Sequence, residues 1–200
     1  MSEVAPPIEY GVASFVKPGN SHSGDLAVVR FYDGGALLSV IDGLGHGDEA
    51  FIAAQCAKTT LDANPQEPVE ALVKRCHAAL RPTRGAVMSL AAIDLRRGLL
   101  RWLGVGNVQG MLCRSDVTTI PAREELLLRS GVVGAQLPTL RSAAIPIRRH
   151  DTLIFTTDGI RSNFADGLTA FATPHSLAQN ILTHHLQGSD DALVLVARIA

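Results

Sequence analysis

Four aspartates share one local sequence pattern, because each stands at an end of a stretch expected to be a strand and three of them stand beside a glycine. They are Asp25 in the segment SGD, Asp42 in VIDG, Asp158 in TDG and Asp190 in SDD. One aspartate of this kind is ordinarily the cap of a turn. Four carboxylates gathered at the ends of sheets repel one another unless cations lie among them. The set therefore predicts a cation site, and oxygen ligands of this kind suit Mg²⁺ or Mn²⁺.

The stretch VIDGLGHG at residues 40–47 leaves further interpretations open. Its glycine-rich part, Gly43–Gly47, could be a phosphate-binding loop, and His46 is a candidate catalytic residue. The stretch lacks the Lys-Ser/Thr ending of a P-loop and the GxGxxG spacing of a dinucleotide fold. Zinc is disfavoured because the chain has no HExxH motif and no CxxC pair. A glycine directly after Asp42 lets the Gly43 carbonyl approach the same ion without a side chain in the way.

The composition is that of an ordinary globular protein, with 46% hydrophobic and 18% charged residues. A chain of 200 residues is expected to form one domain, residues 1–200. The formal net charge of −1 and the aromatic fraction of 4% offer neither a basic surface nor stacking platforms to a nucleic acid. Nucleic-acid binding is therefore not expected.

The start of the chain and the cysteines bear on the cellular compartment. Residues 1–10 lack the basic start and the apolar core of a signal peptide. No run approaches the roughly 18 apolar residues that a spanning helix needs, so no membrane partner is expected. The cysteines are odd in number and far apart, which predicts reduced core thiols in a cytoplasmic protein. They are Cys56, Cys76 and Cys113.

Hydrophobic patterning places the four acids on a framework of many strands and few helices. Strands are expected at residues 12–16, 26–32, 36–41, 85–95, 99–105, 107–114, 144–149, 152–157 and 192–199. Helices are expected at residues 48–61, 68–80 and 174–186. The order lacks the regular strand–helix alternation of a doubly wound sheet. An α+β fold, with two sheets packed face to face and helices outside them, is the predicted fold class.

The ordered set of motifs resembles the PPM-type metal-dependent serine/threonine phosphatases. The motifs are SGD at 23–25, the stretch at 40–47, TDG at 157–159 and the acid pair at 190–191 before the last strand. The resemblance covers nearly the whole chain, and it implies the PPM fold, two antiparallel β-sheets in a sandwich flanked by α-helices. Three further features resemble the bacterial stress-response branch that includes SpoIIE and RsbX. They are RGA at 84–86, GVGN at 104–107 and the GxxGxxLP pattern at 131–138.

The resemblance also implies a role for each acid. Asp42 would bridge two divalent cations, Mn²⁺ or Mg²⁺, and the Gly43 carbonyl would complete the second. Asp158 and Asp190 would bind the first cation, and Asp25 would reach the second directly or through water. The implied reaction is attack of a metal-bridging hydroxide on a phosphoserine or phosphothreonine. Asp42, Asp158 and Asp190 are then the implied catalytic residues.

Some positions depart from the larger relatives. Leu44 stands where many of them have a histidine proposed as general acid, so the proton donor to the leaving oxygen stays open. No arginine lies just upstream of Ser23 to grip the phosphate, and Lys17 is a candidate substitute. Four residues are candidates for secondary roles in catalysis or phosphate binding: His46, Arg84, Arg161 and Asp191.

The expected function is that of a protein phosphoserine/phosphothreonine phosphatase in bacterial stress signalling. Its expected partner is a phosphorylated regulator, a STAS-domain stressosome scaffold or antagonist. One alternative is a catalytically inactive phosphatase fold used for binding, which the presence of all four acids disfavours. The other is a nucleotide-binding protein that uses Gly43–Gly47, which the missing P-loop ending disfavours.

Overall fold

Two β-sheets packed face to face form the centre of the computed structural model, which describes residues 7–45, 47–116, 118–166 and 172–200. The strands are β1 (Ile8–Phe15), β2 (Asp25–Tyr32), β3 (Gly35–Gly43), β4 (Ala86–Asp94), β5 (Leu99–Val105), β6 (Gln109–Cys113), β7 (Arg123–Glu125), β8 (Leu128–Arg129), β9 (Ala143–Pro146), β10 (Thr152–Thr156) and β11 (Ala192–Ile199). The helices are α1 (Asp48–Ala63), α2 (Val69–Leu80) and α3 (Pro174–His185).

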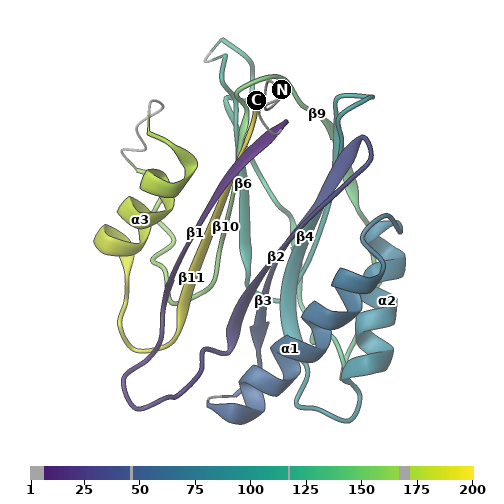
Figure 1. The fold of residues 1–200 in the computed structure, drawn as a ribbon, viewed down its shortest axis with the longest axis vertical. Helices are drawn as coiled ribbons and strands as arrows, with labels where there is room; N and C mark the ends of the chain where they lie inside the picture. Colours follow the sequence, from purple (N-terminus) through teal and green to yellow (C-terminus); the bar gives the residue numbers. More distant parts are fainter. Residues whose placement is uncertain (1–6, 46, 117, 167–171) are drawn as a thin grey trace, which may run out of the picture.

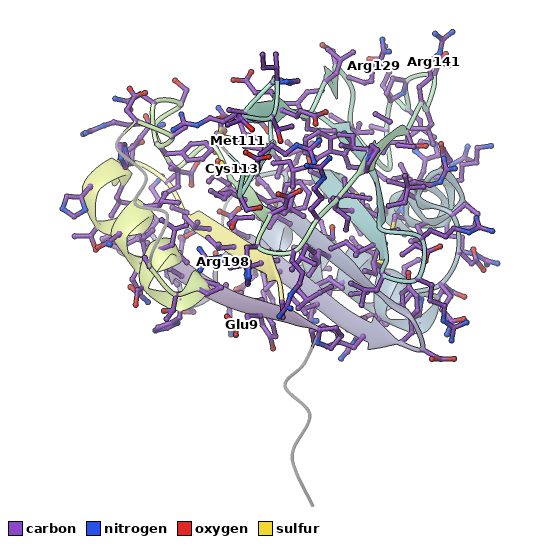
Figure 2. The ribbon with its side chains drawn as sticks, turned by 90° about the horizontal axis from the view of Figure 1, so that it is seen from above. Glu9, Met111, Cys113, Arg129, Arg141 and Arg198 are labelled. Carbon is purple, nitrogen blue, oxygen red and sulfur yellow. The ribbon has the colours of Figure 1, made fainter. Side chains whose placement is uncertain are left out.

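The strands divide into two sheets, and sheet A contains both the first and the last strand of the chain. Sheet A has the order β1-β11-β10-β6-β7, and sheet B has the order β2-β3-β4-β5-β8, with β9 also paired to β5. The pairing is antiparallel apart from the short parallel contact between β5 and β8. Helices α1 and α2 cover the outer face of sheet B, and α3 covers that of sheet A (Figures 1 and 2). The expected α+β sandwich with helices outside both sheets is confirmed.

Three apolar layers hold this arrangement together. Between the sheets, Trp102 and Phe155 are among the largest fully buried side chains. A second layer joins sheet B to α1 and α2, and a third joins sheet A to α3. Met111 and Cys113 of β6 belong to this third layer (Figure 2). Because each large apolar side chain contributes about 1.5–3 kcal/mol when buried, the layers fix where the strand ends lie.

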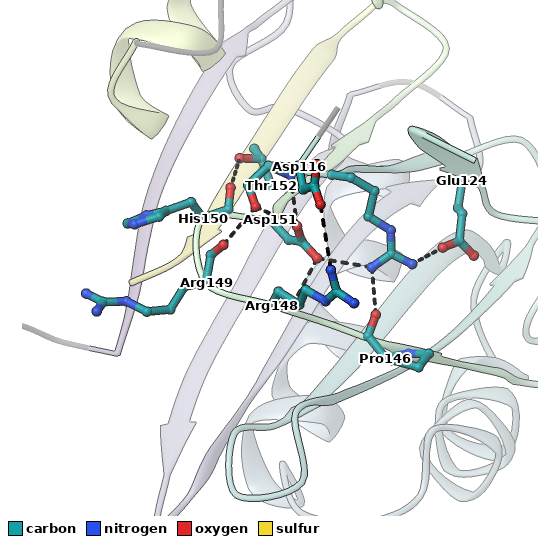
Figure 3. A network of polar contacts seen from close by, with 10 residues as sticks. Asp116, Glu124, Pro146, Arg148, Arg149, His150, Asp151 and Thr152 are labelled. Atoms are coloured by element: carbon teal, nitrogen blue, oxygen red, sulfur yellow. Dashed lines mark hydrogen bonds and ion pairs between the residues drawn. The ribbon is translucent and has the colours of Figure 1, made fainter. Parts of the chain in front are cut away.

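A buried ion network closes one end of sheet A (Figure 3). Arg114, which follows β6, donates from Nη1 to Asp151 Oδ2 at 3.0 Å and also pairs with Glu124. Asp151 precedes β10 and is 1% exposed. The network therefore ties the ends of β6 and β10 that lie away from Asn107 and Asp158.

The structure differs from the sequence-based expectations mainly in short elements. Strand β1 begins at Ile8, earlier than the expected 12–16, because its residues pair along all of β11. Strands β7 and β8 were not expected within 115–150. All three cysteines are free; Cys76 is buried, whereas Cys56 and Cys113 are half-buried. None of the helices in the described part of the chain is long and apolar enough to cross a membrane.

Candidate metal centre

The four predicted acids come together at one end of the sandwich, the lower end in Figure 1. Asp25 is the first residue of β2 and Asp42 is in the last part of β3, while Asp158 follows β10 and Asp190 precedes β11. All four line one cavity of about 440 Å³. The lining residues are Gly24, Asp25, Asp42, Gly43, Leu44, Gly45, Val87, Gly106, Asn107, Ser130, Asp158, Asp190 and Asp191. Each sheet thus contributes two of the predicted acids to the same space.

Two of the acids, Asp25 and Asp42, have strongly raised pKa values. Burial raises the pKa of Asp42 from 3.8 to about 8, and the negative charge of Asp25 adds to this, as do the other acids of the cavity. Burial likewise raises the pKa of Asp25 to about 7, against a lowering by the hydrogen bond from Thr157. A carboxyl whose charged form is disfavoured to this extent is stabilised as an anion by a cation placed beside it.

The other two acids, Asp158 and Asp190, are exposed, and polar neighbours hold them in place. The Asn107 amide donates from Nδ2 to Asp158 Oδ2 at 2.8 Å. Gln187 donates from Nε2 to the Asp158 carbonyl at 2.6 Å, which fixes the main chain at this acid. Asp190 Oδ1 accepts from the Asp191 main-chain N–H at 2.9 Å. The sequence singled out the GVGN segment without assigning a role to Asn107, and it gave no signal for Gln187.

Asp191 lines the cavity but uses both of its oxygens on the main chain. Its Oδ1 accepts from the Lys17 N–H and its Oδ2 from the Gly24 N–H, each at 2.7 Å. Its side chain is buried, with 6% exposure. Asp191 therefore fixes the connection between β1 and β2 just before Asp25.

The glycine-rich turn after Asp42 is shaped by close packing. A Cβ atom at Gly43 would lie 2.0 Å from the Ala50 carbonyl oxygen, so only glycine lets α1 pack this closely. The Gly43 N–H donates to the Gly24 carbonyl and the Leu44 N–H donates to the Gly85 carbonyl, each at 3.0 Å. Two amides of the proposed phosphate-binding loop are thus already used within the fold. His46 lies outside the described residues.

The two candidate arginines occupy different places. Arg84 Nε lies 2.6 Å from Glu49 Oε2, and a Cβ at Gly45 would lie 3.2 Å from Arg84 Cδ. The Arg84 side chain therefore packs beside the glycine turn at Gly45, which lines the cavity, although Arg84 itself is not among the lining residues. Arg161 is exposed and does not line the cavity, and its N–H donates to the His185 carbonyl at 2.9 Å.

The donor set of the cavity suits a hard divalent cation. Within the described residues, no three His, Cys, Asp or Glu side chains converge closely enough to hold one ion by themselves. An ion here would complete its coordination with main-chain carbonyls, the Asn107 amide or water. Mg²⁺ ordinarily keeps several waters and takes only one or two carboxylates, so the residues present fit such an ion.

Comparison with known proteins places this geometry in a family. The family model for stage II sporulation protein E (SpoIIE) matches residues 32–200. The chain belongs to the SpoIIE family. A curated relative, phosphoserine phosphatase RsbX of Bacillus subtilis (strain 168), is 31% identical over 96 residues. That alignment spans 48% of this chain and 48% of RsbX, about half the length of each.

Solved structures confirm the PPM sandwich for this SpoIIE-family chain. A crystal structure of RsbX in complex with magnesium has a TM-score of 0.87 at 22% identity, covering 99% of this chain and 98% of that one. A chain from work on the bacterial stressosome as a modular system has a TM-score of 0.86 at 28% identity, covering 96% and 99%. The PPM Ser-Thr phosphatase MsPP of Mycobacterium smegmatis has a TM-score of 0.73 at 16% identity, covering 96% and 98%. The expected RsbX/SpoIIE-like branch of the PPM family is confirmed.

Proposed function

We propose that this chain is a divalent-cation-dependent protein phosphoserine/phosphothreonine phosphatase. One observation carries the proposal: acids from four separate strand ends line a single cavity, and two of them have strongly raised pKa values. Burying carboxylates together is costly unless a cation neutralises them. The relative named phosphoserine phosphatase supports the substrate class.

In this proposal each acid keeps a distinct task. Asp42 of β3 would bridge two cations, Mg²⁺ or Mn²⁺, with the Gly43 carbonyl beside it. Asp158 and Asp190 would hold one cation and Asp25 the other, each directly or through water. Bound cations supply a water of lowered pKa and neutralise phosphate oxygens. The magnesium complex of RsbX supports Mg²⁺ as one such ion.

Other residues in and around the cavity bear on substrate binding and on the choice of mechanism. Arg84 is the candidate for contact with a phosphate oxygen, because its side chain lies beside Gly45, which lines the cavity. Leu44 lines the cavity and has no proton to give, so protonation of the leaving serine oxygen would come from water. Cys76 is not a nucleophile here, because burial raises the pKa of its thiol to about 12.

The proposed substrate is a phosphorylated STAS-domain component of a bacterial stressosome, either a scaffold or an antagonist. Two findings support it: the likeness to RsbX and the likeness to a chain from the stressosome work. The substrate class is proposed for this chain by analogy with those two proteins.

Phosphate release from a panel of phosphorylated STAS-domain proteins, with and without Mn²⁺, tests the function. We expect release only with the cation, and its loss in Asp42→Asn. Full activity of Asp42→Asn would refute the cation-bridging role of Asp42. Binding of a phosphorylated partner without any release would favour the inactive binding module instead, and saturable ATP binding without added metal would favour the nucleotide-binding alternative.

A further inference from the structure

Thr157 joins the two sheets beside the candidate metal centre. It follows β10 of sheet A, and its hydroxyl donates to Oδ2 of Asp25, the first residue of β2 in sheet B, at 2.7 Å. The same hydroxyl oxygen accepts from the Leu193 N–H of β11 at 2.8 Å. Thr157 is 1% exposed and Asp25 is 5% exposed, so both contacts are shielded from water.

The proton of this hydroxyl has one available direction. A threonine hydroxyl carries a single donor proton and two acceptor lone pairs. Because the Leu193 N–H already donates to the oxygen, the proton of Thr157 is directed at Asp25 Oδ2. This bond orients the Asp25 carboxylate and leaves Oδ1 available to face an ion.

We infer that Thr157 is a positioning residue for cation binding, which acts by orienting the Asp25 carboxylate and by holding the acids of sheet B at a set distance from those of sheet A. The inference rests on the proposed cation-dependent function. Thr157 directly precedes Asp158, and its main-chain N–H donates to the Leu193 carbonyl at 3.1 Å. One residue thus fixes the start of β2, the end of β10 and the start of β11.

The neighbouring Thr156 is a second buried threonine, and it provides a comparison for Thr157. Thr156 is 0% exposed, and its hydroxyl has no hydrogen-bond partner among the residues that the structure describes. The two threonines are adjacent, equally buried and chemically identical, but only the hydroxyl of Thr157 contacts an acid of the cavity. Thr156→Val is therefore a matched control for Thr157→Val.

Calorimetric titration of the full chain with Mn²⁺ in the absence of any phosphorylated substrate tests the inference. We expect Thr157→Val to weaken Mn²⁺ binding by roughly 10–100-fold, the range for removing a hydrogen-bond partner of a metal ligand. Thr157→Ser keeps the hydroxyl and is expected to retain affinity within about threefold of the wild type. Thr156→Val is expected to bind Mn²⁺ as the wild type does.

A purely structural role predicts a different pattern. Thr157→Val leaves the buried Leu193 N–H without an acceptor, so circular dichroism and the thermal midpoint of each metal-free variant are measured alongside. If Thr157→Val does not fold, Thr157→Ala takes its place, because the smaller side chain leaves room for a water beside that N–H. Wild-type affinity in the folded valine or alanine variant overturns the inference. Equal weakening by Thr156→Val and Thr157→Val also overturns it.

The outcome is separable from that of the phosphatase proposal. A wild-type protein that binds Mn²⁺ but releases no phosphate refutes the proposed reaction and leaves the comparison at Thr157 intact. A wild-type protein that binds no Mn²⁺ overturns the positioning role itself.

Discussion

Asp25 and Asp42 are directly opposed residues of the antiparallel pair β2–β3. Like charges in this relationship destabilise a sheet, and here Asp25 is buried and Asp42 is half-buried. The resulting pKa values are about 7 for Asp25 and about 8 for Asp42, against 3.8 for an ordinary aspartate. The pair therefore couples the stability of the metal-free fold to pH and to cations.

The metal-free protein is expected to lose stability as the pH rises from about 4 to above 8. Since the pKa values of Asp25 and Asp42 are raised in the folded state, the folded chain binds more protons than the unfolded chain across this window. Stability then falls with pH, because its slope follows the protons bound by the unfolded state minus those bound by the folded state. Urea unfolding in a chelating buffer at pH 5, 7 and 9 measures the trend. A stability that rises steadily over this range contradicts it.

Cations should reverse this loss, and Asp42→Asn should remove the reversal. A cation competes with protons for these carboxylates, so Mg²⁺ is expected to raise the thermal midpoint more at pH 8.5 than at pH 6. At a concentration of 100 times Kd the added stability is about 2.7 kcal/mol. In Asp42→Asn we expect a small Mg²⁺ effect at both pH values, together with a metal-free stability at pH 9 above that of the wild type. Scanning calorimetry of both proteins at both pH values provides the comparison.

The sequence predicted the meeting of the acids because local patterns at strand ends survive in the fold. Asp25, Asp42, Asp158 and Asp190 each follow or precede a strongly apolar run, and packing two sheets face to face brings such ends to one edge. The short strands β7 and β8 escaped prediction, because two or three residues give no periodicity to detect. Their position depends on contacts with β6 and β5 that are distant in sequence.

The residues that form hydrogen bonds to the acids of the cavity could not be predicted from the sequence, for a related reason. Thr157, Asn107 and Gln187 act through hydrogen bonds to acids 29 to 132 positions away. Nothing in the local pattern around them distinguishes a threonine or an amide that contacts an acid from one that faces solvent. Asp191 shows the same limit, because an acid pair in a sequence does not reveal which member turns inward to the main chain.

The two adjacent acids just before β11 are expected to respond differently to substitution by asparagine. Asp191→Asn leaves only one acceptor for the Lys17 and Gly24 N–H groups, and an unsatisfied buried donor costs about 1–3 kcal/mol. Asp190→Asn leaves the buried contacts in place, so its free energy of unfolding should stay near that of the wild type while cation affinity falls. Urea unfolding and Mn²⁺ titration of both variants separate the two roles. Loss of stability in Asp190→Asn with none in Asp191→Asn would reverse the assignment.

The ion network at the far end of sheet A should affect stability and leave cation binding alone (Figure 3). Asp151→Ala leaves Arg114, whose side chain is 10% exposed, without one of its two acidic partners. Breaking a buried pair by removing one member costs about 3–5 kcal/mol. Asp33→Ala breaks the exposed pair with Arg96 and should change little, because exposed ion pairs contribute little. Urea unfolding of both variants tests this, and an unchanged Mn²⁺ affinity in folded Asp151→Ala shows that the two ends act independently.

Arg84 is expected to contribute to substrate binding through its free guanidinium nitrogens. Its Nε is engaged by Glu49 at 2.6 Å, which holds the side chain beside the turn at Gly45 and leaves the Nη atoms available to a phosphate oxygen. Arg84→Ala should raise KM for a phosphorylated STAS-domain protein by roughly tenfold or more, the loss of one charge-assisted hydrogen bond, while kcat changes less.

Two further variants make the test of Arg84 specific. Arg81→Ala removes an exposed charge from the same connection between α2 and β4 and should leave KM unchanged. Glu49→Gln weakens the hold on Arg84 without removing it, so it should shift KM far less than Arg84→Ala does. An equal rise of KM in Arg81→Ala and Arg84→Ala would indicate a general effect of surface charge on the encounter, because such an effect depends on net charge and not on the position of one guanidinium. Repeating the measurement at higher ionic strength distinguishes the two causes, since the long-range effect is screened by salt and a direct contact with phosphate is screened much less.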